Sequence, residues 1–268
     1  MSAGRPRRRG VWLALAALTG CAVVLPASAE AAGHLLRQTV EVPVAFDRPP
    51  REVRLDAGNA RVSFGAARDG RARVHERLTW ALRRPAVRMT WSGDVLWVKV
   101  ECGHRERMTP GLSCSVALDF QVPAATAVTS TSAAGEVAVR GLTGPVVMRT
   151  RGGSLDLADT SGPVDFEAGS GNLLARGLRA ARVKAHVGSG DVRMGFAGAP
   201  ESVDARTGSG EIEVAVPPGS HYRLRGETGS GDRNIDQAVP DSNAPGVLDL
   251  STGSGSVAVR YAAPDEGL

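Results

Sequence analysis

The residues with the clearest chemical potential in this 268-residue chain are serines that recur between glycines. A Gly-Ser-Gly motif appears five times, with its serine at Ser170, Ser189, Ser209, Ser230 and Ser254. A catalytic serine is singular and has a base beside it. Because these serines recur at near-regular intervals, we interpret them as turn residues and not as nucleophiles.

Metal binding is the second chemistry to weigh, because glycine-rich turns followed by aspartate bind calcium in nonapeptide-repeat β-rolls. Here the repeat is twice too long, and the residue after the turn varies in type: Glu136, Ser154, Asn172, Asp191, Glu211, Asp232 and Ser256. The histidines show no metal-ligand spacing: His34, His75, His104, His186 and His221. The sequence therefore predicts neither a metal nor a cofactor.

Paired carboxylates are the third candidate, because some parallel β-helix enzymes cleave glycans with them. Four acids could line up in this way: Asp156, Asp165, Glu167 and Asp204. We favour a structural interpretation in which acids alternate with cations of neighbouring coils as ion pairs, namely with Arg149, Lys184 and Arg206. The sequence favours a noncatalytic protein and leaves a glycan-active enzyme as an alternative.

The strands and turns that position these residues come from one sequence motif that is repeated seven times between residues 128 and 260. The last glycine of its turn falls at Gly135, Gly153, Gly171, Gly190, Gly210, Gly231 and Gly255. The intervals are 18, 18, 19, 20, 21 and 24 residues, which is typical of a stacked repeat. Seven positions before each glycine stands an aliphatic residue: Val128, Val146, Val164, Val183, Val203, Leu224 and Leu248.

Alternating apolar residues on both sides of each glycine predict two short strands per repeat, with one face buried and one exposed. After the turn this pattern fails once, at Arg233. One coil cannot bury its own apolar row, so neighbouring coils must stack. We therefore predict an all-β fold, a parallel β-solenoid resembling a single-stranded β-helix, with about seven coils of 18 to 24 residues. The turn glycines are expected to adopt positive backbone angles.

Three further segments complete the domain organisation. Residues 36–123 alternate less regularly and are predicted to form an irregular β part that caps the open apolar end of the solenoid at 124–262. Gln237 to Gly246 is interpreted as a loop that leaves one coil, and residues 263–268 as a frayed, disordered tail.

The N-terminal segment is typical of an export signal, because arginines precede an apolar run that starts at Val11. This segment contains two alternative cleavage sites. Ala27-Ser28-Ala29 fits ordinary signal peptidase and a leader over 1–29, whereas Leu18-Thr19-Gly20-Cys21 fits a lipobox, a leader over 1–20 and a lipidated Cys21. We expect an extracytoplasmic protein, either secreted or anchored to the outer face of the membrane.

The charge balance argues against nucleic acid as a partner. The chain has 32 basic and 28 acidic residues, and four arginines but no acid lie before Glu30. Removing the leader leaves the two signs equal, so the high isoelectric point comes mostly from the signal. Membrane contact is expected only through the leader or a lipid at Cys21.

The remaining two cysteines, Cys102 and Cys114, are twelve residues apart across a loop that contains Pro110 and Gly111. In an oxidising compartment a disulfide between them would close this loop.

The combination resembles a bacterial family of exported, adhesin-like β-solenoid proteins whose domain has no known function. The motifs that carry this resemblance are the phased Gly-Ser-Gly turns, such as Thr207 to Val214 and Val187 to Val192, over residues 38 to 261. Similar members, chiefly actinobacterial, have a cysteine pair before a Val-Pro strand end, here Val122-Pro123. The resemblance implies fold and location, and brings no catalytic or binding residues.

Our leading hypothesis is a noncatalytic adhesin-like solenoid whose polar faces meet a protein or an envelope glycan. The repeat region has only Tyr222 and Tyr261 as possible sugar platforms, which favours a protein partner. An envelope-stress or signalling accessory protein, anchored through Cys21, is the second hypothesis.

Overall fold

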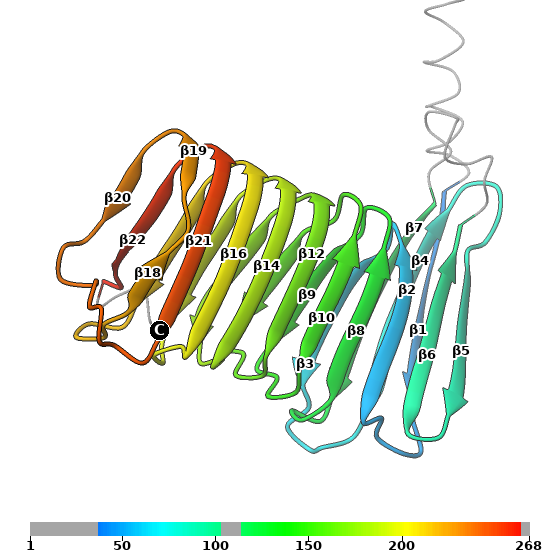
Figure 1. Cartoon of the computed structure of the whole chain (residues 1–268). Coiled ribbons are helices and arrows are strands. Elements are labelled where there is room, and N and C mark those ends of the chain that lie inside the picture. The colour runs from blue at the N-terminus through cyan, green and yellow to red at the C-terminus, as the bar shows by residue number, and fades with distance from the viewer. Residues whose placement is uncertain (1–36, 103–113, 264–268) are drawn as a thin grey trace, which may run out of the picture. The chain divides into compact units, whose positions relative to one another are not determined.

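The computed structural model describes residues 37–102 and 114–263, and within these ranges the chain forms strands and no helix (Figure 1). The predicted all-β class is confirmed. The strands before the repeats are β1 (Gln38–Ala45), β2 (Glu52–Gly58), β3 (Arg61–Ala66), β4 (Arg73–Trp80), β5 (Ala86–Ser92), β6 (Val95–Glu101) and β7 (Ser115–Val122).

The repeats contribute pairs of short strands, one on each side of the glycine turn. The first five pairs are β8 (Ala127–Ser132), β9 (Glu136–Arg140), β10 (Val146–Thr150), β11 (Leu155–Ala158), β12 (Val164–Ser170), β13 (Leu173–Leu178), β14 (Arg182–Ser189), β15 (Val192–Phe196), β16 (Ser202–Ser209) and β17 (Ile212–Val216). The last strands are β18 (Arg223–Arg225), β19 (Thr228–Ser230), β20 (Arg233–Ile235), β21 (Val247–Ser254) and β22 (Val257–Tyr261).

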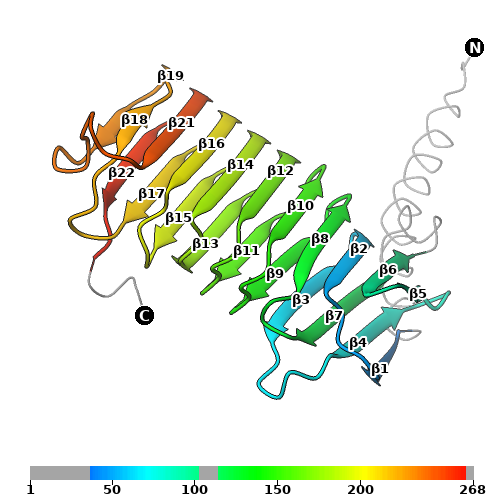
Figure 2. The same cartoon turned by 60° about the horizontal axis from the view of Figure 1, so that its bottom comes forward.

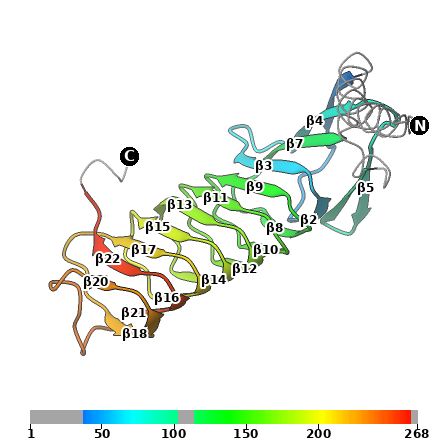
Figure 3. The same ribbon diagram turned by 90° about the horizontal axis from the view of Figure 1, so that it is seen from above.

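The described strands belong to two 11-stranded sheets. Sheet A has the order β1-β4-β7-β3-β9-β11-β13-β15-β17-β22-β20. Sheet B has the order β18-β21-β16-β14-β12-β10-β8-β2-β6-β5, with β19 also paired to β21. Strands of successive repeats lie side by side within each sheet (Figure 2). Seen from above, β9 to β17 of sheet A form one layer and β8 to β16 of sheet B the other (Figure 3).

The core lies between these layers, because every second residue of each strand points inward. In sheet B, Val146 is in parallel register with both Val128 and Val164, and the same column continues along the sheet to Leu248. In sheet A the column runs from Val137 to Val257. Both columns are almost fully buried from β8 to β17 and again in β21 and β22. The fold is therefore β-solenoid-like, with the aliphatic ladders that the repeat predicts.

The order of the last two repeats differs from the simple stacking that we expected. The repeat containing Leu248 lies directly on the one containing Val203, and the earlier repeat containing Leu224 lies outside both. In sheet A, β22 likewise lies between β17 and β20. The loop over residues 237–246, between β20 and β21, gives the chain enough length to return and place β21 between β18 and β16. The last strands thereby gain a neighbour on each side.

The N-terminal strands show the same inversion. Although β2 and β3 come early in the chain, β2 pairs with both β6 and β8, and β3 pairs with both β7 and β9. At both ends of the repeats the chain thus doubles back, so that strands far apart in sequence lie side by side. An inserted strand loses its neighbours on two sides if it frays, so this arrangement protects segments near the chain ends.

At the end of the stack formed by β18 and β20, a buried tyrosine lies beside the 237–246 loop. Tyr222 is 2% exposed and lies beside the loop, where its N–H donates to the Val239 carbonyl (3.0 Å). Val239 and Ala244 of the same loop are also buried. Arg233 stands in outermost strand β20, where its guanidinium donates to the Gly226 and Arg225 carbonyls. No further described strand covers that position, which explains why an arginine can replace the aliphatic residue.

Two compact units divide the chain. Of the described residues, the smaller unit contains 37–40, 78–85, 102 and 114–115, and the larger contains 41–77, 86–101 and 116–263. The surfaces discussed below lie within the larger unit. The predicted leader, Cys21 and nearly all of the predicted tail lie outside the described residues. No helix in the described ranges is long and apolar enough to span a membrane.

Candidate functional site

The Gly-Ser-Gly turns form a corner in which each residue stacks on its counterpart. Ser170, Ser189 and Ser209 lie in register on neighbouring strands, and the column continues through Ser254 to Ser230. All five side chains are exposed. The column is a repeated surface feature, as expected for turn residues.

The residue after the turn glycine has a structural task at this corner. The Asn172 Oδ1 atom accepts a hydrogen bond from the N–H of Asp191 (2.9 Å), and Asp191 Oδ1 accepts one from the N–H of Glu211 (3.0 Å). Each side chain thus satisfies a backbone donor one coil further on. These oxygens hold the stack together, and in the described ranges no group of three or more His, Cys, Asp or Glu side chains is arranged to hold a metal ion.

The turn glycines are required for two reasons, of which we anticipated one. Five have positive φ: Gly171, Gly190, Gly210, Gly231 and Gly255, at 127° to 142°. Gly135 and Gly153 do not, which contradicts our expectation that all turn glycines need such angles. At every one of the seven a Cβ atom would overlap a backbone carbonyl oxygen of the neighbouring coil. Close backbone approach is therefore the shared reason for glycine.

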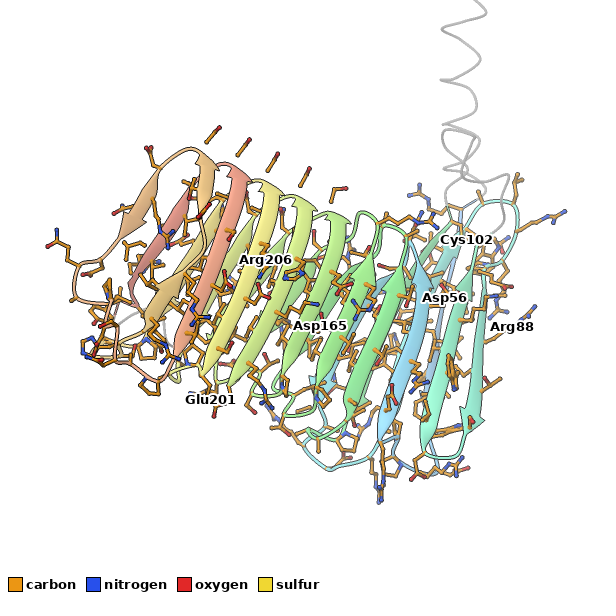
Figure 4. The ribbon with its side chains drawn as sticks, viewed as in Figure 1. Asp56, Arg88, Cys102, Asp165, Glu201 and Arg206 are labelled. Atoms are coloured by element: carbon orange, nitrogen blue, oxygen red, sulfur yellow. A yellow bond between two sulfur atoms is a disulfide. The ribbon has the colours of Figure 1, made fainter. Side chains whose placement is uncertain are left out.

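The outward side of the middle of sheet B carries two rows of charged side chains. We call this surface the charged face, and it consists of Arg149, Asp165, Glu167, Lys184, His186, Asp204, Arg206 and Asp249. Asp165 and Arg206 lie on the same side of the sheet (Figure 4). A shallow groove of about 710 Å³ runs across it beside the corner glycines.

Ion pairs link the charged face from coil to coil. Arg149 contacts Glu167 and lies 3.2 Å from Asp165, and Lys184 Nζ donates to Glu167 (3.0 Å). Further along, Asp204 is paired with Arg206 (2.9 Å), which also approaches Asp249 (3.5 Å), and His186 Nε2 lies 3.2 Å from Asp204 Oδ1. This is the alternation of acids and cations that the repeat predicts.

The pairing sets the protonation behaviour of the central acid. Hydrogen bonds from Arg149 and Lys184 hold the pKa of Glu167 below its usual value, and the same contact with Glu167 raises the pKa of Arg149. A general acid needs the opposite shift, because it must keep its proton near neutral pH. Glu167 is therefore suited to a fixed ion pair.

One of the four carboxylates proposed to line up does not. Asp156 lies in β11 of sheet A, where it approaches Arg176 (3.6 Å), whereas Asp165, Glu167 and Asp204 lie in sheet B. The prediction was wrong for Asp156 because it follows the turn, and each turn moves the chain to the other sheet.

A second surface on sheet B, nearer its β5 edge, is one that the sequence reasoning missed. We call it the Trp97 groove; it has a volume of about 740 Å³ and is lined by Glu52, Arg54, Leu55, Asp56, Arg88, Thr90, Trp97, Val98, Lys99, Thr129 and Thr131. Trp97 is 46% exposed, and the Arg54 guanidinium lies 5.1 Å from its ring centroid. Alternation would have shown that Trp97 points outward, because Leu96 and Val98 point inward, but it does not indicate which strands lie beside β6.

The disulfide prediction is confirmed, since Cys102 and Cys114 are bonded in the smaller unit with Cα atoms 6.0 Å apart.

The sequence also matches a family of known proteins. Residues 90–260 match the family model described as Toastrack DUF4097. The chain belongs to this family. The Toastrack DUF4097 match covers most of the region in which we noted a resemblance to adhesin-like domains of unknown function. No protein of curated function matches the chain.

Solved structures similar to this Toastrack DUF4097 chain come from several bacteria. A "putative adhesin" from Bacteroides fragilis is 10% identical, with a TM-score of 0.51 over 83% of this chain and 97% of the other. A "putative cell adhesion protein" from Clostridium sporogenes is 9% identical, with a TM-score of 0.36 over 84% and 100%. A "putative lipid binding protein" from Parabacteroides distasonis is 12% identical, with a TM-score of 0.37 over 83% and 96%. The first of these supports the same fold.

Proposed function

We propose that the protein is a noncatalytic, adhesin-like interaction module outside the cytoplasm, and that sheet B presents its binding surface to a protein or an envelope glycan. The observation that carries the proposal is the charged face, where ion pairs link β10, β12 and β14 and, further along, β16 and β21. A surface whose side chains are already ordered loses less conformational entropy when a partner binds.

The absence of catalysis is part of this proposal. It is supported by the ion pairs that occupy Asp165, Glu167 and Asp204 and by the lowered pKa of Glu167. The Bacteroides fragilis relative, which shares the fold, is named as a "putative adhesin", and this agrees with an interaction role.

The location is also a proposal. The bonded pair Cys102 and Cys114 supports an oxidising compartment, because structural disulfides persist outside the reducing cytoplasm. We propose export by a leader that ends at residue 29, or at residue 20 with a lipid on Cys21. Mass spectrometry of the mature N-terminus decides between them.

The number of coils and the role of the N-terminal part are also proposals. We propose that the seven sequence repeats form seven coils over residues 124–262 and that residues 36–123 cap them. We also propose that the chain is of the actinobacterial type with Gly-Ser-Gly-Asp repeats. Parallel register from β2 to β21 in sheet B and from β3 to β22 in sheet A supports the coils.

The test of function is binding of the mature protein to isolated cell envelopes in a sedimentation assay. The variant Arg149→Gln/Lys184→Gln/Arg206→Gln should bind at least about tenfold more weakly, because it removes the cations of the charged face. The matched control Arg61→Gln/Arg176→Gln/Arg193→Gln removes three cations from the outward side of sheet A. Equal binding by both variants, or no binding by the native protein, would contradict the proposal.

A further inference from the structure

The Trp97 groove is built from eight outward side chains in two rows across four strands. The first row runs from Thr90 through Trp97 and Arg54 to Thr129, each in register with the next. The second row runs in the same way across the same strands, as Arg88, Lys99, Asp56 and Thr131. Asp56 and Arg88 come from different strands, β2 and β5 (Figure 4). Antiparallel β5 contributes here, so this arrangement does not recur among the repeats.

Trp97 is the unusual member of this grid. It is the only large aromatic side chain among the exposed apolar residues of the described ranges, where the others are Val40, Leu82 and Leu174. Because nearly half of the Trp97 surface is exposed to water, this residue lacks the stabilisation that full burial of its side chain would give. A single exposed apolar residue is common on protein surfaces, so the inference rests on the grid of polar and charged side chains around the ring.

The guanidinium that lies over the indole is held in place by a chain of polar contacts. Arg54 donates two hydrogen bonds to Glu52, from Nε to Oε1 (2.7 Å) and from Nη2 to Oε2 (3.2 Å). Glu52 also accepts a hydrogen bond from Thr129 Oγ1 (3.0 Å). Because these contacts fix the guanidinium beside the Trp97 ring, the platform is ordered before any ligand arrives.

The second row gives the groove a charged rim. Arg88 and Lys99 share a single carboxylate, Glu101, at 3.6 Å and 3.0 Å. Asp56 is the register partner of Lys99, so the lining of the groove counts three cations, Arg54, Arg88 and Lys99, against two carboxylates, Glu52 and Asp56. Beside the cations, Asp56 and Thr131 offer acceptors for hydroxyl groups.

We propose that the Trp97 groove binds an acidic saccharide, with a sugar ring on the indole and its carboxylate or phosphate group at Arg88 and Lys99. The C–H groups of a sugar ring suit the negative face of an aromatic ring. The volume of about 740 Å³ falls within the range of small-ligand sites. The inference rests on the proposed function and names a ligand class for it.

The groove fits this ligand better than an apolar peptide, because only one aromatic platform is present and the surrounding side chains are charged or carry hydroxyl groups. A hydroxyl-rich ligand can satisfy those groups, whereas an apolar segment would leave them without partners.

The test uses trigalacturonate as an acidic probe and galactotriose as a neutral one, titrated into the mature protein by isothermal calorimetry at 20 mM and 500 mM salt. We expect trigalacturonate to bind at low salt and to weaken at high salt, because exposed charges are screened. Trp97→Ala should reduce affinity by at least about tenfold, and Trp97→Tyr should restore part of it. Leu174→Ala, on sheet A, is the matched control and should bind like the native protein.

Arg88→Ala/Lys99→Ala should remove the preference for trigalacturonate over galactotriose. Circular dichroism checks that each variant is folded. Failure of both probes to bind, or unchanged affinity in a folded Trp97→Ala variant, would overturn the proposal. Binding of an apolar peptide library in their place would assign the groove to a protein partner. If envelope sedimentation persists while the saccharides fail, the ligand class is wrong and the interaction function stands.

Discussion

The repetitive strands β8–β22 and the irregular strands β2–β7 pack their side chains in different ways. In the repeats, a side chain meets its counterpart from the next coil, so valine stacks on valine and an acid pairs with a cation one coil away. The irregular part also stacks residues in register, as Phe64 does on Phe120 with centroids 4.9 Å apart, but it adds contacts that no other strand pair repeats, such as Phe46 edge to face on Trp91 at 5.7 Å. Repetition produces a scaffold, whereas a site with one particular shape needs residues that occur once.

The two surfaces of sheet B follow this division. The charged face is a periodic array that presents similar groups along its length, which suits an extended or repetitive partner. The Trp97 groove has a single platform and a single charged end, which suits one ligand in one orientation. The same sheet thus carries both kinds of surface because non-repetitive strands β5, β6 and β2 continue the repetitive stack.

The largest effect should come from a charge placed inside the repetitive ladder. Val203→Asp should destabilise the fold by about 3–5 kcal/mol, because a buried carboxylate there has no partner. The neighbouring Asp204→Asn change lies on the outward side of the same strand and should cost less than about 1 kcal/mol. Thermal denaturation followed by circular dichroism measures both. Similar losses for the two variants would show that the strand is not one-sided.

Sequence alone predicts this ladder because a period of two around a repeating glycine has one physical interpretation. It also predicts the ion pairs, since Lys184 is in register with Asp165 and lies one step diagonally from Glu167 on the same outward face. It could not predict the inverted order at the C-terminal end, because Leu224 and Leu248 are equally apolar and either could stack on Val203. The Trp97 groove was missed because its rows come from β5, β6, β2 and β8, whose adjacency no repeat indicates.

The second effect tests the irregular part. Cys102→Ser/Cys114→Ser should lower stability by about 3 kcal/mol on a chain-entropy estimate, because the twelve-residue separation closes a loop of the unfolded chain. Within the described residues every tryptophan precedes β7, so fluorescence reports on this part while circular dichroism reports on all strands. We expect the urea midpoint to fall more by fluorescence than by circular dichroism. Native protein with reductant is the control, and coincident shifts would mean that both parts unfold together.

The third prediction separates backbone strain from close packing at the repetitive corner. Gly190→Ala combines a positive φ of 142° with overlap against the Gly171 carbonyl, whereas Gly219→Ala has a positive φ of 78° and open space. Gly219→Ala should cost about 1 kcal/mol and Gly190→Ala about 2–3 kcal/mol. Equal urea midpoints for the two variants would remove close approach as the reason for the glycine column.

The smallest effect concerns the acid of the charged face. Arg149 and Lys184 lower the pKa of Glu167 in the folded protein from its ordinary 4.5, so its contribution to stability is present above pH 4.5 and is lost as pH falls through the lower folded value. Since Glu167 is partly exposed, this contribution should stay below about 1 kcal/mol.

Glu167→Gln should therefore flatten the acid limb of a stability profile between pH 5 and pH 3, and Glu201→Gln is a control on an exposed residue at the opposite corner. A native profile that is unchanged by Glu167→Gln would contradict the coupling. Salt should reduce the difference, because exposed ion pairs are screened. A periodic array divides its electrostatic stabilisation among many weak pairs, so no single acid of the charged face should dominate the response to pH.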